Sequence, residues 1–522
     1  MSQSARPRLL VPLLLAGTFW LSPASRCPFA SAGDRNGSLA LALESIHTEE
    51  LREHVEYLAH DKLEGREAGS RGGRLAARYL AAQLARTGLE PAGVDGGFFQ
   101  PFPPNYRNVL AMLKGSDPVL RNQYIVVGAH YDHVGYGTSS NSRGPVGHVH
   151  NGADDNASGV SGLIELAEAF AMLAQPPRRS VLFVGWDAEE KGTLGSLHWR
   201  NHPTVPLGRV VFSVNMDMIG WLRDELVTVY GSRSGYGLRR LTSLANQQEH
   251  LRLAFDWTTK HNSDHYVFLE ADIPTLLFHT GLHPYYHTPY DDAQRINVAG
   301  MRRVVRLVLS VIYAVADHPE APRFRAAWRN ERQPARATGR SDRRNRPRRL
   351  GVTWDARDDQ SFGIRVRRVA PGSPAQKAGI KPGDRIVRVD GRPVRSGSDL
   401  VGAVAMAGKR VDIEVERKGH KVAKLQARLG GKPLRLGIRW RVDEAEPQAV
   451  ILTDVIPGTP AARAGLQVGD RIYRIGGVDF TNQQEFAQLA RSLPMPLTLL
   501  VERDGQLRTV QLQAAGQSRR AA

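Results

Sequence analysis

The sequence predicts an α/β domain with a largely covered sheet, followed by two copies of a small β-rich domain. Two observations predict this class. Short apolar segments alternate with segments of helical periodicity as far as about Asp317, which favours a sheet covered by helices. Beyond that point the sequence repeats itself at a fixed spacing. The chain of 522 residues is long enough for three domains, since a domain takes roughly 150 residues.

The α/β domain is expected over residues 39–317. Apolar residues at helical spacing predict a helix over 39–61, and a glycine-rich turn separates it from a second helix over 75–85. Buried strands and amphipathic helices then alternate. The expected strands are 108–113, 124–128, 180–184 and 210–215, and the expected helices are 159–173, 238–248 and 298–315.

The C-terminal part of the chain contains an internal repeat. Three pairs of segments match at a spacing of 86 residues: Val369–Ala375 with Val455–Ala461, Gly383–Ile386 with Gly469–Ile472, and Trp354 with Trp440. A repeat of this length predicts two structurally equivalent domains, expected over 350–430 and 434–515.

The N-terminus has the pattern of a secretory signal. Arg6 and Arg8 precede the apolar stretch Leu9–Leu21, and Ala30-Ser31-Ala32 offers the small residues that a signal peptidase needs. We expect a signal peptide over 1–32 and export to the periplasm, cell envelope or exterior, with an uncleaved anchor as the alternative. No other run approaches membrane length, so we expect no further membrane span. The single cysteine, Cys27, excludes a disulfide framework.

The net charge of +18 is unevenly distributed. Residues 321–350 hold eleven arginines against two acidic residues, a net +9 that is half the total. With its prolines, this stretch predicts a solvated linker over 318–349. The alternative is contact with an anionic surface or polymer. The concentration of charge in one segment argues against sequence-specific nucleic-acid binding.

Five segments place His or carboxylate residues in loops, three of them directly after a predicted strand. They are Gly128–Asp132, Asn151–Gly159, Asp187–Glu190, Asn215–Met218 and Tyr285–Pro289. Because sites in open α/β sheets lie at the carboxyl ends of the strands, these groups are expected to converge on one crevice.

Carboxylates gathered in such a crevice repel one another, and a bound divalent cation removes that repulsion. Two His and two carboxylates around one shared carboxylate fit two catalytic zinc ions. Taken singly, each residue has an ordinary structural interpretation: Asp154 could cap the following helix, and a Glu-Glu pair usually lies on a solvated face.

In this order, the residues closely resemble the secreted two-zinc aminopeptidase family, which has glutamate-carboxypeptidase and glutaminyl-cyclase relatives. The resemblance covers 39–317 and implies a mixed-sheet zinc exopeptidase sandwich. It implies that His130 and Asp217 hold one zinc, Glu190 and His287 the other, and that Asp154 bridges them. It further implies that Glu189 is the general base and Asp132 the carboxylate that orients the His ligand. Tyr286 is a candidate oxyanion donor or, alternatively, an aromatic residue packed at the rim.

The repeats resemble PDZ domains of bacterial envelope proteases, on the strength of the Pro-Gly-Ser-Pro-Ala and Gly-Asp-Arg-Ile motifs. The resemblance implies that 350–352 and 436–438 form loops that receive a peptide C-terminus, with the peptide added as a strand. The alternative is that one or both domains only pack against the rest of the chain.

Together these patterns predict an exported zinc aminopeptidase that acts on peptides, with PDZ domains that dock peptide C-termini or partners. A carboxypeptidase or dipeptidase of the same fold is the nearest alternative. A PDZ scaffold with a vestigial peptidase domain and a polyanion-binding protein are the others.

Overall fold

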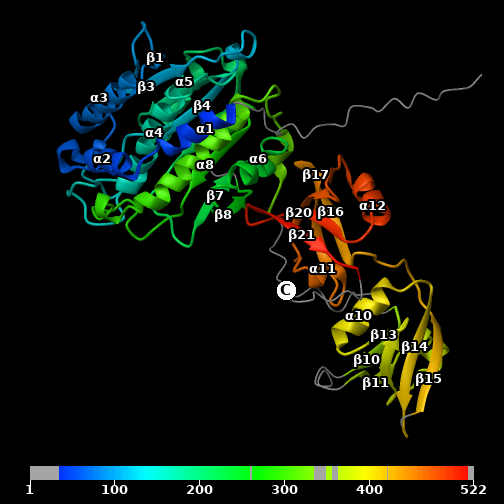
Figure 1. Ribbon diagram of the computed structural model, residues 1–522. Helices are drawn as coiled ribbons and strands as arrows, with labels where there is room; N and C mark the ends of the chain where they lie inside the picture. Colours follow the sequence, from blue (N-terminus) through cyan, green and yellow to red (C-terminus); the bar gives the residue numbers. More distant parts are fainter. Residues whose placement is uncertain (1–34, 259–260, 334–348, 355–361, 420, 515–522) are drawn as a thin grey trace, which may run out of the picture.

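The computed structural model describes residues 35–258, 261–333, 349–354, 362–419 and 421–514 (Figure 1). The predicted signal peptide, with Cys27, and residues 334–348 of the arginine-rich segment lie outside the described residues. Within the described ranges, no helix is both long and apolar enough to cross a membrane.

The first domain is built on a nine-stranded mixed sheet in the order β1-β3-β5-β4-β6-β9-β7-β8, with β2 paired to β3. The strands are β1 (Glu90–Pro91), β2 (Phe99–Phe102), β3 (Tyr106–Leu113), β4 (Tyr124–His130), β5 (Ser180–Trp186), β6 (Val210–Met216), β7 (Leu226–Tyr230), β8 (Arg252–Asp256) and β9 (Thr275–His279). The central strands β5, β4, β6 and β9 are parallel neighbours. Their carboxyl ends therefore meet at one edge of the sheet. The four strands predicted from the sequence correspond to β3, β4, β5 and β6 and are confirmed.

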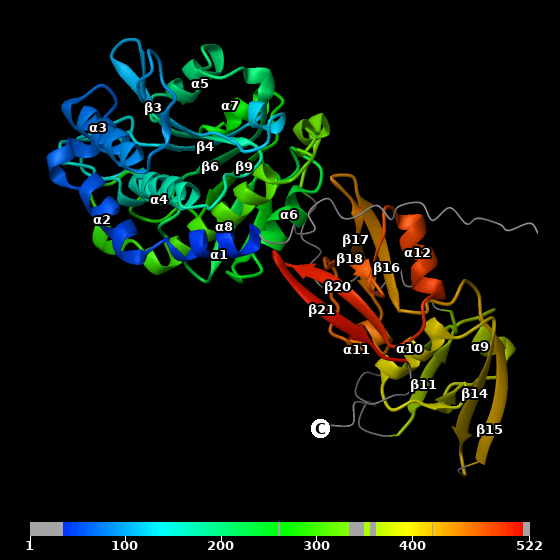
Figure 2. The same cartoon turned by 45° about the horizontal axis from the view of Figure 1, so that its top comes forward.

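Helices cover both faces of this sheet (Figure 2). They are α1 (Arg35–Glu44), α2 (Thr48–Leu58), α3 (Arg71–Arg86), α4 (Gly159–Ala171), α5 (Leu194–Asn201), α6 (Leu238–Ala245), α7 (His265–Glu270) and α8 (Val298–Ala316). Short helical turns are η1 (Asp61–Arg66), η2 (Leu120–Asn122), η3 (Ala153–Ser158), η4 (Leu207–Arg209), η5 (Ala293–Arg295) and η6 (Ala326–Asn330). The helix expected over 39–61 is two helices, because the chain breaks between α1 and α2.

The central strands β4, β5 and β6 are largely apolar because both faces of the sheet are buried there. Val127 and Phe183 pack under the face covered by α4 and α8. Val126 and Leu182, one residue away in each strand, pack on the other face with Trp199 of α5. Alternate side chains of a strand point to opposite faces, so a covered sheet needs apolar residues at every position.

The two repeats form separate antiparallel sheets of equivalent topology. The first repeat contains β10 (Val352–Trp354), β11 (Ile364–Val369), α9 (Pro374–Lys377), β12 (Arg385–Val389), β13 (Arg392–Pro393), α10 (Gly397–Met406), β14 (Arg410–Arg417) and β15 (Lys421–Arg428). The second contains β16 (Ile438–Asp443), β17 (Glu446–Val455), α11 (Pro460–Arg463), β18 (Arg471–Ile475), β19 (Val478–Asp479), α12 (Gln483–Ser492), β20 (Leu497–Arg503) and β21 (Gln506–Leu512). Five of these pairs begin 86 residues apart, as the sequence predicts: β10 and β16, α9 and α11, β12 and β18, β13 and β19, α10 and α12.

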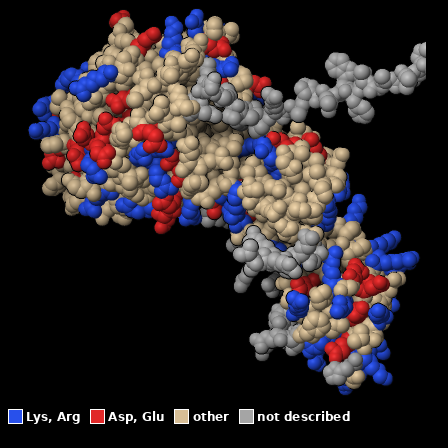
Figure 3. All heavy atoms as spheres, viewed as in Figure 1, with Lys and Arg blue, Asp and Glu red and all other residues tan. Residues whose placement is uncertain are grey.

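The second repeat lies beside α6 of the first domain, and the first repeat lies farthest from it (Figures 1 and 2). Lys and Arg side chains are spread over this outer repeat among fewer acidic ones (Figure 3). The start of the arginine-rich segment is not the solvated linker that its composition predicts. Arg325 is buried against Glu331, its backbone N–H donates to Ser234, and Trp328 is buried. The packed chain therefore extends past Asp317.

Candidate metal centre

The structure brings four of the predicted ligands to the carboxyl edge of the sheet. His130 is the last residue of β4, and Asp217 directly follows β6. Glu190 lies in the loop after β5, and His287 lies in the loop after β9. These are the loops at which sequence position alone placed the candidate residues.

The carboxylate between these ligands is Asp155, not Asp154. His130 Nε2 lies 3.4 Å from Asp155 Oδ1 and 3.6 Å from Asp217 Oδ1. His287 Nε2 lies 3.0 Å from Asp155 Oδ2 and 3.2 Å from Glu190 Oε1. The two oxygens of one carboxylate thus face two separate donor groups, which is the arrangement of a bridging ligand.

Asp154 is turned away because its carboxylate is already engaged. Its Oδ1 accepts hydrogen bonds from the Gly220 N–H at 2.6 Å and the Ser158 hydroxyl at 3.0 Å. Its Oδ2 faces His283 Nε2 at 3.3 Å. The assignment of Asp154 as the bridge is therefore wrong in this structure, and the residue instead fixes the turn η3 against the loop after β6.

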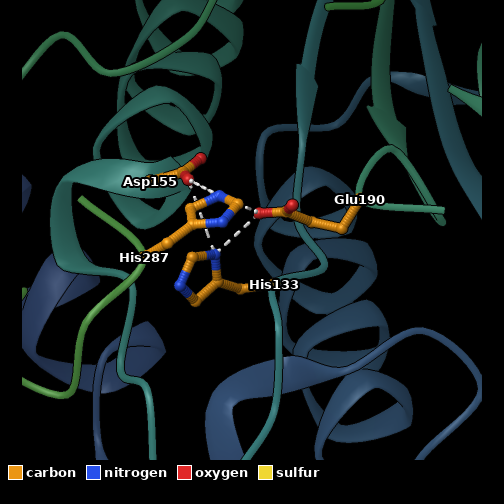
Figure 4. A group of neighbouring side chains, drawn as sticks. All are labelled: His133, Asp155, Glu190 and His287. Atoms are coloured by element: carbon orange, nitrogen blue, oxygen red, sulfur yellow. Dashed lines mark hydrogen bonds and ion pairs between the residues drawn. The ribbon is translucent and has the colours of Figure 1, made fainter. Parts of the chain in front are cut away.

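One of the two donor groups contains a residue that the sequence analysis missed. His133, Asp155, Glu190 and His287 each contribute an atom to a cluster within 4.8 Å (Figure 4). His130, Asp155 and Asp217 form the second cluster. His133 Nδ1 lies 2.9 Å from Glu190 Oε1. The sequence feature that could have revealed His133 is its position three residues after His130.

Asp132 is completely buried and holds the loop after β5. Its two carboxylate oxygens accept hydrogen bonds from the backbone N–H groups of Glu189 at 3.0 Å and Glu190 at 3.2 Å. The Asp132 carboxylate lies 3.8 Å from His130 Nδ1, whereas its backbone carbonyl lies 3.2 Å from that nitrogen. Asp132 thus positions both the His130 ring and the Glu189-Glu190 pair.

Tyr286 lies half-buried at the edge of the cluster. Its ring contacts that of His287 at a centroid distance of 3.9 Å, and the Arg143 guanidinium lies 4.6 Å from its centroid. Burial and the nearby charge of Asp155 raise the pKa of its hydroxyl. The hydroxyl is thus kept protonated close to the cluster, as a hydrogen-bond donor must be.

A second missed residue, Arg66, holds two of the site loops together. Its guanidinium has no exposed surface and donates to the carbonyls of Tyr131 at 2.9 Å, Asn151 at 2.6 Å and Gly152 at 2.9 Å. Burial lowers the pKa of Arg66 to about 10, and nearby carboxylates, Asp155 first among them, oppose that shift. From sequence alone, this stretch is predicted only to be a glycine-rich turn.

The donor set fits bound cations. Asp155 Oδ2 and His287 Nε2 are buried and have no hydrogen-bond partner within the described residues, yet both point into the cluster. Tetrahedral zinc with ligands at about 2.0–2.1 Å separates its donors by about 3.3–3.4 Å. The donor separations of 3.0–3.6 Å around Asp155 match this spacing.

The electrostatics also favour a cation. Burial opposes the charged form of His287, but Asp155 and Glu190 outweigh burial and raise its pKa to about 11. Burial likewise opposes the charged form of Asp155, yet the imidazoles of His130 and His287 beside its carboxylate hold the pKa of Asp155 well below its usual value. Burial raises the pKa of Glu189 well above its usual value. The carboxylates thus draw positive charge into the cluster.

With this geometry in view, the chain can be compared with known families. Residues 108–312 match Peptidase family M28, and residues 365–417 and 451–503 match the PDZ domain. The chain therefore contains an M28 peptidase domain followed by two PDZ domains. Both resemblances inferred from the motifs are confirmed, and the two repeats are hereafter PDZ1 and PDZ2.

Individual relatives match parts of the chain. The aminopeptidase YwaD of Bacillus subtilis (strain 168) is 26% identical over 231 residues, which are 42% of this chain and 46% of that protein. The periplasmic serine endoprotease DegP of Escherichia coli (strain K12) is 30% identical over 160 residues, 28% of this chain and 33% of that protein. The chain thus spans less than half of either curated relative. A crystal structure of the Legionella pneumophila LapA aminopeptidase superposes with a TM-score of 0.46 at 21% identity, covering 56% of this chain and 78% of that one.

PDZ1 contains a groove of about 1050 Å³ between β10 and α10. Leu350, Val352, Trp354, Leu400 and Val404 line it with apolar surface. Residues of PDZ2 also line it, among them Ile456 and Pro457. At the corresponding position of PDZ2, Trp440 of β16 contacts Phe486 of α12 at a centroid distance of 4.9 Å.

Proposed function

We propose that the chain is an exported zinc exopeptidase that removes N-terminal residues from peptides. The observation that carries the proposal is the pair of donor groups sharing Asp155 at the carboxyl edge of an M28 sheet. Two zinc ions fit the set: His130, Asp155 and Asp217 would hold one, and Asp155, Glu190 and His287 would hold the other. An aminopeptidase among the relatives supports the direction of cleavage.

Bound zinc would supply Lewis-acid polarisation of the scissile carbonyl and would acidify a water molecule. Glu189 takes a proton from that water molecule as the water oxygen bonds to the carbonyl carbon. Glu189 then gives the proton to the leaving amine as the C–N bond breaks, a role worth roughly 10²–10⁴-fold in rate. The Tyr286 hydroxyl donates a hydrogen bond to the developing oxyanion. Asp132 keeps Glu189 in place through the backbone of its loop.

Replacement of Glu189 tests this assignment. Glu189→Gln preserves shape but cannot transfer a proton, so kcat should fall by roughly 10²–10⁴-fold. Zinc content, measured by elemental analysis, should stay at two per chain. Glu270→Gln, at an exposed residue paired with Arg200, is the matched control. Full activity in Glu189→Gln would remove Glu189 from the mechanism.

The end of the peptide that is cleaved needs a separate measurement. The proposed enzyme hydrolyses an aminoacyl-anilide, rejects an N-acetylated peptide and loses activity with a chelator. The opposite substrate preference would identify a carboxypeptidase. No hydrolysis by the zinc-loaded chain would favour a scaffold whose PDZ domains alone are functional.

For the PDZ domains we propose that PDZ1 docks peptide C-termini in the groove beside α10. Its apolar lining suits an apolar terminal side chain, and the peptide would add as a strand to β10. Leu400→Glu places a charge in this groove and should abolish binding of a labelled peptide that ends in an apolar residue. Its counterpart, Phe486→Leu in PDZ2, should leave that binding unchanged.

A further inference from the structure

His133 is not among the ligands that the resemblance to the two-zinc aminopeptidase family implies. It lies on the loop after β4, three residues beyond His130, and has no exposed surface. The ring is held on one side by the backbone of Gly152, where a Cβ would come within 2.5 Å of it. Its orientation toward Glu190 is therefore fixed by packing.

The Nδ1 atom of His133 lies at a ligand's distance from the other donors (Figure 4). It is 2.9 Å from Glu190 Oε1 and 3.7 Å from Asp155 Oδ2. His287 Nε2 is 3.0 Å and 3.2 Å from the same two oxygens. These separations bracket the value of about 3.3–3.4 Å between the donors of tetrahedral zinc.

We propose that His133 is a fourth protein ligand at the position formed by Asp155, Glu190 and His287. This inference rests on the proposed two-ion centre and makes that centre asymmetric. Four protein donors close a tetrahedral site, whereas three donors leave a position open. The His133 position therefore retains its ion, and the His130–Asp217 position holds the exchangeable ion with the open coordination site.

A purely structural role for His133 makes a different prediction. In that case Nδ1 only donates a hydrogen bond to Glu190, and any side chain that keeps this bond keeps the metal affinity. His133→Asn offers an amide N–H at about the position of Nδ1 but lacks the imidazole lone pair. His133→Phe removes both the donor and the lone pair.

The first experiment measures zinc retained per full-length chain against increasing chelator concentration. The wild type should release one ion readily and hold the second. Both His133 variants should lose the tightly held ion at about 100-fold lower chelator strength, at least the effect known for residues that only support ligands. His150→Asn is the control, since His150 is equally buried but its Nε2 contacts Ser142 and belongs to neither donor group. Wild-type retention in His133→Asn would overturn the proposal.

Anomalous scattering from crystals of the zinc-loaded wild type gives a second readout that no variant can disturb by misfolding. An ion about 2.0–2.1 Å from His133 Nδ1 supports the proposal. An ion held by Glu190 and His287 but far from that atom overturns it and leaves the proposed function intact. No zinc at either position would instead refute the proposed function.

Discussion

Two regions of the molecule gather buried carboxylates, and they differ in what neutralises them. At the metal centre, Asp155, Glu190 and Asp217 face histidines, and the buried Arg66 directs its N–H groups to backbone carbonyls. At the junction of the peptidase domain with PDZ2, the buried carboxylates of Asp443 and Glu502 are each paired with arginine.

The PDZ2 junction is an ion-pair network. Arg239 makes a bidentate pair with the fully buried Glu502 at 2.9 Å and 3.0 Å. Arg233 and Arg471 bind the two oxygens of Asp443 at 2.7 Å and 2.9 Å. Backbone bonds reinforce it, including Leu253 N–H to the Asp504 carbonyl at 2.7 Å.

This difference distinguishes a metal-binding site from a structural interface between domains. Buried charge is tolerated when it is paired and hydrogen-bonded, and arginine supplies both within the chain. Where the protein leaves carboxylate and imidazole atoms without such a partner, the missing charge has to come from outside, and the donor geometry then selects a metal ion. The sequence alone showed acidic residues in both regions but not this distinction.

The contrast between the metal centre and the junction fails if Asp155 is not needed for zinc binding and hydrolysis. Asp155→Asn weakens both donor groups at once, and loss of several kcal/mol of metal-based stabilisation should lower kcat/KM by about 10³-fold or more. The neighbouring Asp154→Asn should keep zinc, because an amide oxygen still accepts the Gly220 and Ser158 hydrogen bonds. Zinc content and hydrolysis measured on both variants decide between the adjacent residues. Equal loss in both would contradict the assignment.

The stability of the junction should fall when an arginine is removed, but not when a chelator is added. Arg239→Ala leaves Glu502 buried without its main partner, a change that costs about 3–5 kcal/mol in comparable pairs. Urea unfolding of the full chain measures it. Arg508→Ala, at a half-exposed arginine 3.7 Å from Asp470, should change stability by under about 0.5 kcal/mol. A chelator that empties the metal centre should leave the junction resistant to proteolysis.

Acid should weaken the junction only at low pH. Burial opposes the charge of Asp443, but Arg471 and Arg233 outweigh it and hold its pKa at about 2, below the ordinary 3.8. Its stabilisation is thus complete above about pH 4 and is lost as the pH falls toward 2. Burial raises the pKa of Glu446 to about 7, so this residue favours the folded state more as the pH falls from 7 to about 4.5. The free energy of unfolding, measured across this pH range, should show both effects. Asp443→Asn should reduce the loss of stability toward pH 2.

Much of the fold could be predicted because its signals are local. The apolar runs of β4, β5 and β6 reflect burial on both faces, and the repeat spacing of 86 residues is preserved in the helices of both PDZ domains. The loops that carry His130, Glu190 and Asp217 follow from predicted strand ends, whereas the loop of His287 follows β9, a strand that was not predicted. The break between α1 and α2 and the packing of Arg325 did not follow, since both depend on distant contacts.

By itself, therefore, the sequence determined four strands of the first sheet, the repeat and three of the loops that meet at the metal centre, because periodicity and strand ends are properties of short segments. Only the tertiary structure decided between Asp154 and Asp155, since hydrogen bonds from Gly220 and Ser158 engage one carboxylate and leave the other facing the histidines. It also decided the place of His133, whose partners Asp155, Glu190 and His287 come from three other loops. Side-chain direction within a turn is set by groups far away in the chain, and no local pattern records it.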